Sequence, residues 1–154
     1  MPKRKPAPGT ILKIPFDGPI HTYARVLRHP FIAVYDCKTS EDLTSMEGIV
    51  AQKVLFVVAV MDRAVTDGRW EVVGKVPLAD GEIPIPDQFM QDMFNPNNCK
   101  IIDSSGNIRE ATIEECVGLE RAAVWEAEHV EDRIRDHYKG RPNRWLESMK
   151  LIRP

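Results

Sequence analysis

Residues 10–36 read TILKIPFDGPIHTYARVLRHPFIAVYD, and this stretch decides the fold. It contains three short runs of β-branched, aromatic and other apolar residues, separated by Asp17-Gly18-Pro19 and by His29-Pro30. Turn-forming residues between such runs are typical of strands that follow one another in an antiparallel sheet. The sequence therefore predicts a β-meander, which is also how small barrels of the SH3 type begin.

The strand-like pattern resumes after a predicted helix start at residues 39–43. Residues 54–61 (VLFVVAVM) are continuously apolar, which predicts a central strand covered on both faces. Residues 70–76 predict another strand, with Gly74 as a candidate bulge. The four prolines of residues 77–98 cannot donate ladder hydrogen bonds, so this segment is predicted to be a long irregular crossing.

The last third of the chain is predicted to be richer in helix. Thr112 and Glu115 have the spacing of a capping box, which predicts a short helix. The longest predicted helix covers residues 126–138 and ends at Gly140. The remaining predictions are a hairpin over residues 99–110, a last inner strand at 121–124 and, over 144–152, either a helical turn or a closing strand.

These elements predict an α+β fold: a curved, mainly antiparallel sheet or SH3-like barrel with a C-terminal helix. The length of 154 residues suits one domain with one core. Residues 1–9 combine three prolines with three basic side chains and are predicted to form a flexible basic arm. Residues 10–154 are predicted to form a single α+β domain.

Composition argues against several classes of protein. The chain has 21 basic and 23 acidic side chains, and a nucleic-acid binder normally carries a basic excess. Its longest apolar run, residues 54–61, falls far short of the roughly 20 residues that span a bilayer. The three cysteines include no CxxC pair, which favours the reducing cytoplasm and gives no zinc signature. We therefore expect neither nucleic acid nor membrane as a partner, and no metal or other cofactor.

Motifs of well-known enzymes are also missing from the sequence. It contains no GxSxG, HExxH, Walker A or GxGxxG pattern. This weakens an enzymatic interpretation and leaves open a site of another kind.

The helix predicted over residues 126–138 has an apolar side, formed at 100° per residue by Ala127, Val130, Ile134 and Tyr138. Its other side carries His129, Asp132, Arg133, Asp136 and His137. The two histidines are eight residues apart, about 12 Å along a helix, which is too far to share one ion. Glu131 and Arg135 have the spacing of a favourable surface pair. This side is either a solvated, ion-paired face or a functional surface, foremost a protein-contact patch.

Charge is distributed unevenly near this helix. Residues 110–132 contain eight acids and one base, whereas residues 133–154 contain seven bases and two acids. An acidic stretch can attract a basic partner, because complementary charge accelerates encounter and sets specificity. The alternative is that both stretches are solvated and partly cancel in space.

Several blocks of the sequence resemble the immunity protein 26 family. The most specific are GLERAAVW at 118–125, EHVEDRIRDH at 128–137 and RPNRWLES at 141–148. Further resemblance lies in PGTILKIP at 8–15, YARVL at 23–27, FIAVYD at 31–36, GRW at 68–70 and VVGKVP at 72–77. The resemblance thus covers most of residues 8–148.

The resemblance implies a bacterial antidote that binds a cognate polymorphic toxin and occludes it, without a cofactor. We expect the protein to be a monomer or weak dimer. The residues expected to contact such a toxin are Glu126, Glu128, His129, Asp132, Arg133 and Asp136. The same family name is attached to a HocA-type phosphotriesterase, so the alternative is a metal-assisted phosphotriester hydrolase. His129, Asp132 and Asp136 would be its candidate catalytic residues, since such hydrolysis needs a water activated by a metal or a base.

Overall fold

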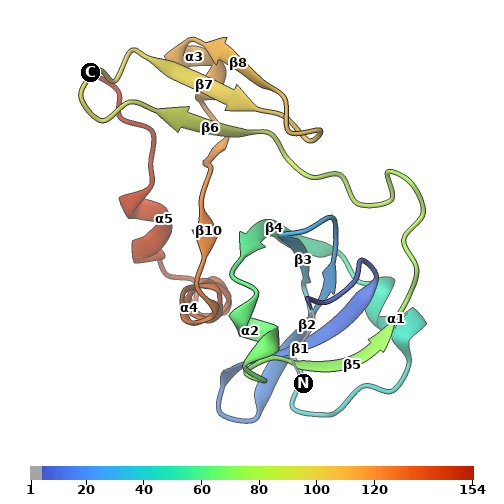
Figure 1. Ribbon diagram of the computed structural model, residues 1–154. Coiled ribbons are helices and arrows are strands. Elements are labelled where there is room, and N and C mark those ends of the chain that lie inside the picture. Colours follow the sequence, from blue (N-terminus) through green and yellow to red (C-terminus); the bar gives the residue numbers. More distant parts are fainter. Residues whose placement is uncertain (1–4) are drawn as a thin grey trace. The chain divides into compact units, whose positions relative to one another are not determined.

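The structure, a computed structural model, describes residues 5–154 and combines helices with strands (Figure 1). The α+β class with a C-terminal helix is confirmed. Residues 1–4 of the predicted basic arm lie outside the described part, and the single domain over residues 10–154 stays a prediction. The described chain groups into two compact units: unit 1 comprises residues 5–83 and Val124–Arg141, and unit 2 comprises Pro84–Ala123 and Pro142–Pro154.

Unit 1 is built on a six-stranded sheet with the order β10-β4-β3-β2-β1-β5. Strands β1 to β4 pair antiparallel in sequence order, which confirms the predicted meander, and β10 joins β4 in parallel. In the described chain the sheet is open, with β10 and β5 as its edges, rather than closed into a barrel. The strands are β1 (Thr10–Asp17), β2 (Ile20–Val26), β3 (Phe31–Tyr35), β4 (Val54–Val60), β5 (Glu71–Lys75) and β10 (Val124–Trp125).

Strand β4 differs from the central, doubly covered strand predicted for residues 54–61. It lies second from one edge of the sheet, and only its last three residues are buried, whereas β2 and β3 are buried almost throughout. The half-buried ring of Phe56 is covered by Arg133, whose guanidinium carbon lies 3.9 Å from the ring centre. The prediction was wrong because an arginine can cover an apolar side chain with its stem and planar head group.

The first helix begins later than the predicted start at residues 39–43. Helix α1 (Met46–Val50) follows Ser45, whose hydroxyl accepts a hydrogen bond from the Gly48 amide at 3.1 Å. Thr39 instead exchanges backbone hydrogen bonds of 2.8 and 3.1 Å with His21 of β2. These two bonds hold Thr39 in an extended bridge, so it does not cap a helix.

The bulge predicted at Gly74 is confirmed. The register of β5 on β1 shifts there, between Ile11 and Leu12. A Cβ atom at Gly74 would overlap the Met46 thioether, so glycine lets α1 approach the sheet closely. A short helix, α2 (Arg63–Thr66), follows β4.

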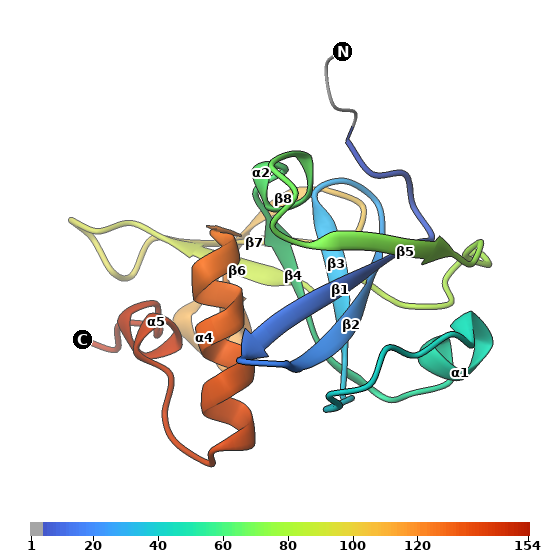
Figure 2. The same ribbon diagram turned by 90° about the horizontal axis from the view of Figure 1, so that it is seen from below.

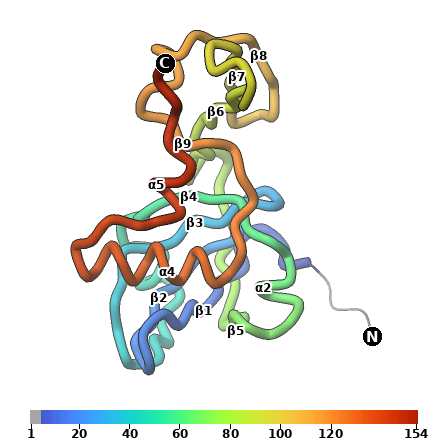
Figure 3. Tube along the Cα trace, turned by 90° about the vertical axis from the view of Figure 1, so that its left-hand side faces the viewer, coloured from blue at the N-terminus to red at the C-terminus, as the bar shows by residue number. Residues whose placement is uncertain are grey.

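The longest helix, α4 (Ala127–Tyr138), lies against β1 (Figures 2 and 3). It ends before Gly140, whose φ of 65° suits a residue without a Cβ atom. Its predicted apolar side is confirmed. Ala127, Val130 and Ile134 are buried, and the ring of Tyr138 stacks on Phe16 with 5.5 Å between the ring centres.

A buried arginine joins the sheet of unit 1 to the segment that follows β5. The side chain of Arg25 in β2 is only 1% exposed and forms an ion pair with Glu82. Its guanidinium also donates to the backbone carbonyls of Val76, at 3.0 Å, and Pro77, at 2.7 Å. The first residues of the predicted irregular crossing are therefore fixed by one buried cation.

Unit 2 contains a four-stranded sheet with the order β8-β7-β6-β9 and a small core. The predicted hairpin and capping box are confirmed, the latter at α3. The core consists of Phe89, Cys99, Ile101, Ile113 and Cys116. The elements are β6 (Gln88–Gln91), β7 (Cys99–Ile102), β8 (Ile108–Ala111), α3 (Ile113–Cys116), β9 (Glu120–Arg121) and α5 (Arg144–Ser148).

Two predictions for this part of the chain need correction. Residues 77–98 are not irregular throughout, because Gln88 to Gln91 pair with β7 and avoid every proline of the segment. The single strand predicted at 121–124 is divided between the two sheets: β9 pairs with β6, and β10 with β4. Of the two alternatives for residues 144–152, the structure has the helical turn, α5.

Candidate functional site

The acidic stretch at residues 110–132 is continuous in sequence but divided between the two units. Glu110, Glu114, Glu115 and Glu120 belong to unit 2. The other four acids, Glu126, Glu128, Glu131 and Asp132, belong to unit 1, on α4 and at its N-terminal cap. A candidate binding surface must therefore be built within one unit, and the side chains of α4 provide the denser set.

Glu131 is the largest departure from the predicted solvated face. It is 7% exposed, and its carboxylate accepts hydrogen bonds from the indole N–H of Trp70 at 2.9 Å and from Arg69 at 2.8 and 2.7 Å. This carboxylate raises the pKa of the Arg69 guanidinium through hydrogen bonding. Glu131 thus fixes α4 to the residues preceding β5, and the predicted surface pair with Arg135 is wrong.

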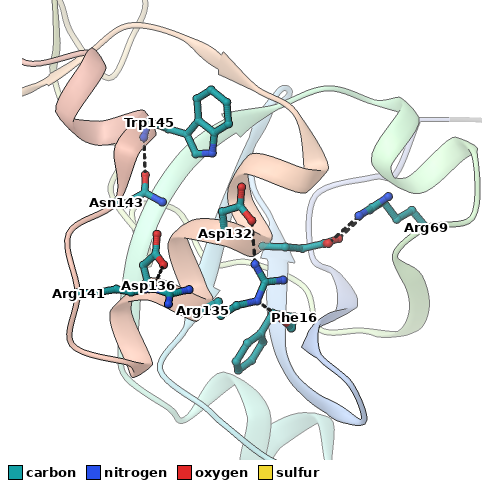
Figure 4. A network of polar contacts seen from close by, with 9 residues as sticks. Phe16, Arg69, Asp132, Arg135, Asp136, Arg141, Asn143 and Trp145 are labelled. Atoms are coloured by element: carbon teal, nitrogen blue, oxygen red, sulfur yellow. Dashed lines mark hydrogen bonds and ion pairs between the residues drawn. The ribbon is translucent and has the colours of Figure 1, made fainter.

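The next acids along the helix are held by arginines (Figure 4). Arg135 donates to Asp132 at 2.8 Å and to the backbone carbonyl of Phe16 at 2.7 Å, which attaches α4 to β1. Arg141 donates to Asp136 at 2.5 Å, and the Asp136 side chain is only 13% exposed. Both carboxylates therefore help to position the helix and its C-terminal end.

Two further predicted contact residues are also engaged within unit 1. The guanidinium of Arg133 stacks on Phe56 and lies 5.3 Å from the ring centre of Trp125. Glu126, at the helix cap, accepts hydrogen bonds from two nitrogens of Arg63. His129 is half-buried.

Glu128 is the most exposed acid of this set. Its side chain is 73% exposed and lies in the first turn of α4, with one carboxylate oxygen 3.8 Å from Arg69. Beside it is a hollow of about 200 Å³, lined by Ala64, Ala127 and five charged residues of both signs: Arg63, Asp67, Arg69, Glu126 and Glu128. The first turn of α4 is therefore a charged surface on a rigid support, since Glu131 anchors the following turn.

The three candidate catalytic residues do not form a recognisable reaction centre. Asp132 and Asp136 already accept hydrogen bonds from arginines, which leaves fewer lone pairs for a water molecule or a metal ion. Among residues 5–154, no group of three or more His, Cys, Asp or Glu side chains could hold a metal ion. The hydrolytic alternative is supported by the resemblance and not by this geometry.

The three cysteines are free thiols. Burial raises the pKa of Cys116 and, together with the charge of Asp36, that of Cys37. Both therefore remain protonated at neutral pH, and the protonated thiol is a poor nucleophile.

Comparison with known protein families matches residues 7–100 to immunity protein 26. The chain belongs to the immunity protein 26 family. The matched residues contain β1 to β6, so the family signal lies in the sheet of unit 1 and the start of unit 2. The blocks from 118 to 148, which we expected to be the most specific, lie beyond the match, and their resemblance stays a prediction. No curated protein and no solved structure gives a significant match.

Across the part of the chain that the structure describes, every helix is too short or too polar to cross a bilayer. Sequence reasoning found the helix that carries the candidate surface and missed the residues that fix it, Glu131 and Arg69. The signal that could have indicated Glu131 is its place at the border of the apolar sector, where at 100° per residue it lies beside Ala127 and Tyr138.

Proposed function

We propose that this protein neutralises a cognate bacterial toxin by binding and occluding it in the cytoplasm of the producing cell. The observation that carries the proposal is the match of residues 7–100 to immunity protein 26. Such a protein needs a rigid, charged contact surface rather than a reaction centre, because rigid surfaces lose less entropy on binding.

The proposed contact surface is the polar side of α4, made of Glu126, Glu128, His129, Asp132, Arg133 and Asp136. Glu128 is its leading residue, because its exposed carboxylate can pair with a basic partner without first leaving a buried contact. The remaining five support the surface and form its edge. Basic toxin side chains would be attracted over several ångströms, and this attraction weakens as salt is added.

The test is growth of cells that express the toxin-like domain encoded beside this gene, with and without this protein. Rescue from that domain, and not from an unrelated toxin, supports the proposal. Absence of rescue, with both proteins folded, rejects it.

The surface is tested separately with Glu128→Lys, for which the chain offers a matched control in Glu47→Lys. Both glutamates are exposed and each is the second residue of its helix, so the helix dipole affects both substitutions alike. We expect Glu128→Lys to weaken toxin binding about tenfold and Glu47→Lys to leave it unchanged. Equal affinity of the two variants would place the contact surface elsewhere.

A further inference from the structure

The loop between β6 and β7 in unit 2 presents two large apolar side chains to solvent. Met93 is 85% exposed and Phe94 is 99% exposed. The loop backbone is fixed: the Asp92 carboxylate accepts hydrogen bonds from the amides of Phe94, at 2.7 Å, and Asn95, at 3.1 Å. The Asp92 amide in turn donates to the Asn98 carbonyl at 3.0 Å. The exposure is thus a property of a defined turn.

Such a tip is unusual on the surface of a protein. Single exposed apolar residues are common, whereas two adjacent large ones on a fixed loop form an anchor that gains free energy when a partner covers it. Aromatic residues and methionine are enriched in the buried centres of protein interfaces. The loop therefore has the composition and the rigidity of an interface anchor.

The same unit contains an apolar hollow of about 360 Å³. This volume falls within the roughly 300–1,000 Å³ of pockets that enclose small ligands, so it can accommodate an aromatic side chain. The apolar part of its lining is Cys116, Val117, Leu119, Leu146, Met149 and Leu151. Its charged part has two basic residues, Lys150 and Arg153, and one acidic residue, Glu120.

The loop and the C-terminal segment that lines the hollow are connected through Gln91. Its side-chain amide donates to the carbonyls of Pro96, at 2.9 Å, and Ile152, at 2.7 Å, and its oxygen accepts from the Ile152 amide at 2.9 Å. One polar side chain therefore fixes both features within a single unit.

We propose that unit 2 binds a second copy of this chain, with Met93 and Phe94 of each copy inserted into the apolar hollow of the other. The charges are complementary in sum, because basic residues outnumber acidic ones in the lining of the hollow and the loop that would enter it carries the carboxylate of Asp92. Each copy offers both the anchor and the hollow, so a two-fold axis allows the contact to form twice in one closed dimer. This self-association is independent of the toxin-binding surface, which lies on unit 1.

The experiment is sedimentation of the full-length protein between about 1 µM and 1 mM, a range that covers weak interfaces. We expect a concentration-dependent dimer, abolished by Phe94→Ser in the anchor and by Met149→Glu in the hollow. Ile108→Ser is the control, because Ile108 is a 58% exposed apolar residue of the same unit outside the proposed contact. Circular dichroism of each variant verifies that it is folded.

Mixing the two monomeric variants provides the decisive result. Phe94→Ser retains the hollow and Met149→Glu retains the anchor, so the mixture regains one of the two contacts and associates, whereas each variant alone stays monomeric. A wild type that is monomeric throughout the range, or a dimer that persists in both variants, overturns the proposal. Loss of toxin binding in Phe94→Ser with a monomeric wild type also overturns it, since the anchor would then serve the toxin.

Discussion

Buried charges hold unit 1, where Arg25 and Glu131 each connect segments that are more than 50 residues apart. Unit 2 has a core of only five buried apolar residues, and its longest polar contact uses the neutral side chain of Gln91, which binds Ile152 across 61 residues. The apolar surface is distributed in the opposite way. Within residues 5–154, five of the seven large apolar residues that are strongly exposed belong to unit 2: Met93, Phe94, Ile108, Val117 and Ile152.

The difference shows that a high density of charged residues in the sequence does not predict which surface is exposed for binding a partner. On α4 most of the charged side chains that suggested a binding face are occupied in holding the helix to its sheet. In unit 2 a less conspicuous stretch, DMFN at residues 92–95, presents the more exposed side chains. Four predictions test this contrast.

The largest effect is expected from Arg25→Leu in unit 1. The substitution leaves the carbonyls of Val76 and Pro77 without their donor and removes the partner of Glu82, which should lower the free energy of unfolding by about 3–5 kcal/mol. Arg28→Leu is the control, since Arg28 is exposed two residues beyond the end of β2 and its loss should change stability by less than about 1 kcal/mol. Urea denaturation measures the free energy of unfolding of both variants. Similar losses in the two would mean that the buried contacts of Arg25 do not stabilise the fold.

The next effect distinguishes two phenylalanines five residues apart in unit 2. Phe89 is 1% exposed and Phe94 is 99% exposed. Phe89→Ala should cost about 3–4 kcal/mol of stability, because it leaves a cavity in a small core. Phe94→Ala should change stability by less than about 0.5 kcal/mol. Thermal unfolding followed by circular dichroism measures both at a concentration where the protein is monomeric, and a destabilised Phe94→Ala would show that the loop packs inside its own chain.

A smaller effect should separate Glu131 from Glu128, three residues apart on α4. Glu131→Gln weakens charge-assisted hydrogen bonds to Trp70 and Arg69, and we expect a loss of about 2 kcal/mol. Glu128→Gln removes an exposed carboxylate and should be neutral within about 0.5 kcal/mol. Chemical denaturation followed by tryptophan fluorescence compares the free energies of unfolding of the two variants. Equal stability of the two variants would reject Glu131 as the anchor of the helix.

The smallest effect is local to the loop of unit 2 and depends on pH. Hydrogen bonds from the amides of Phe94 and Asn95 hold the pKa of Asp92 below its ordinary value of about 3.9. Because the folded-state pKa is lowered, the stabilisation of the loop is present above the unfolded-state value and is lost as the pH falls through the folded-state value. An NMR titration of the Phe94 amide should have its midpoint below 3.9, and a midpoint at or above that value would show that the loop is not closed in solution.

The sequence by itself determined the local elements: the meander of residues 10–36, the capping box at Thr112, and the helix near 126–138 with its apolar side. Each depends on residues within one or two turns of each other, where periodicity, caps and turn-forming residues act directly. Membership of the immunity protein 26 family could likewise be predicted from short sequence blocks, and the match over residues 7–100 confirms it.

Only the tertiary structure decided which polar residues are buried. The contacts of Arg25 with Val76 and of Glu131 with Trp70 join positions 51 and 61 residues apart. No local pattern encodes such a partner, so Glu131 had the sequence character of a solvated residue. The tertiary structure likewise divided the acidic stretch between two units and left Phe94 in solvent. Burial depends on which distant segments the sheets bring together, and this is why the fold class could be predicted from the sequence while the available surface could not.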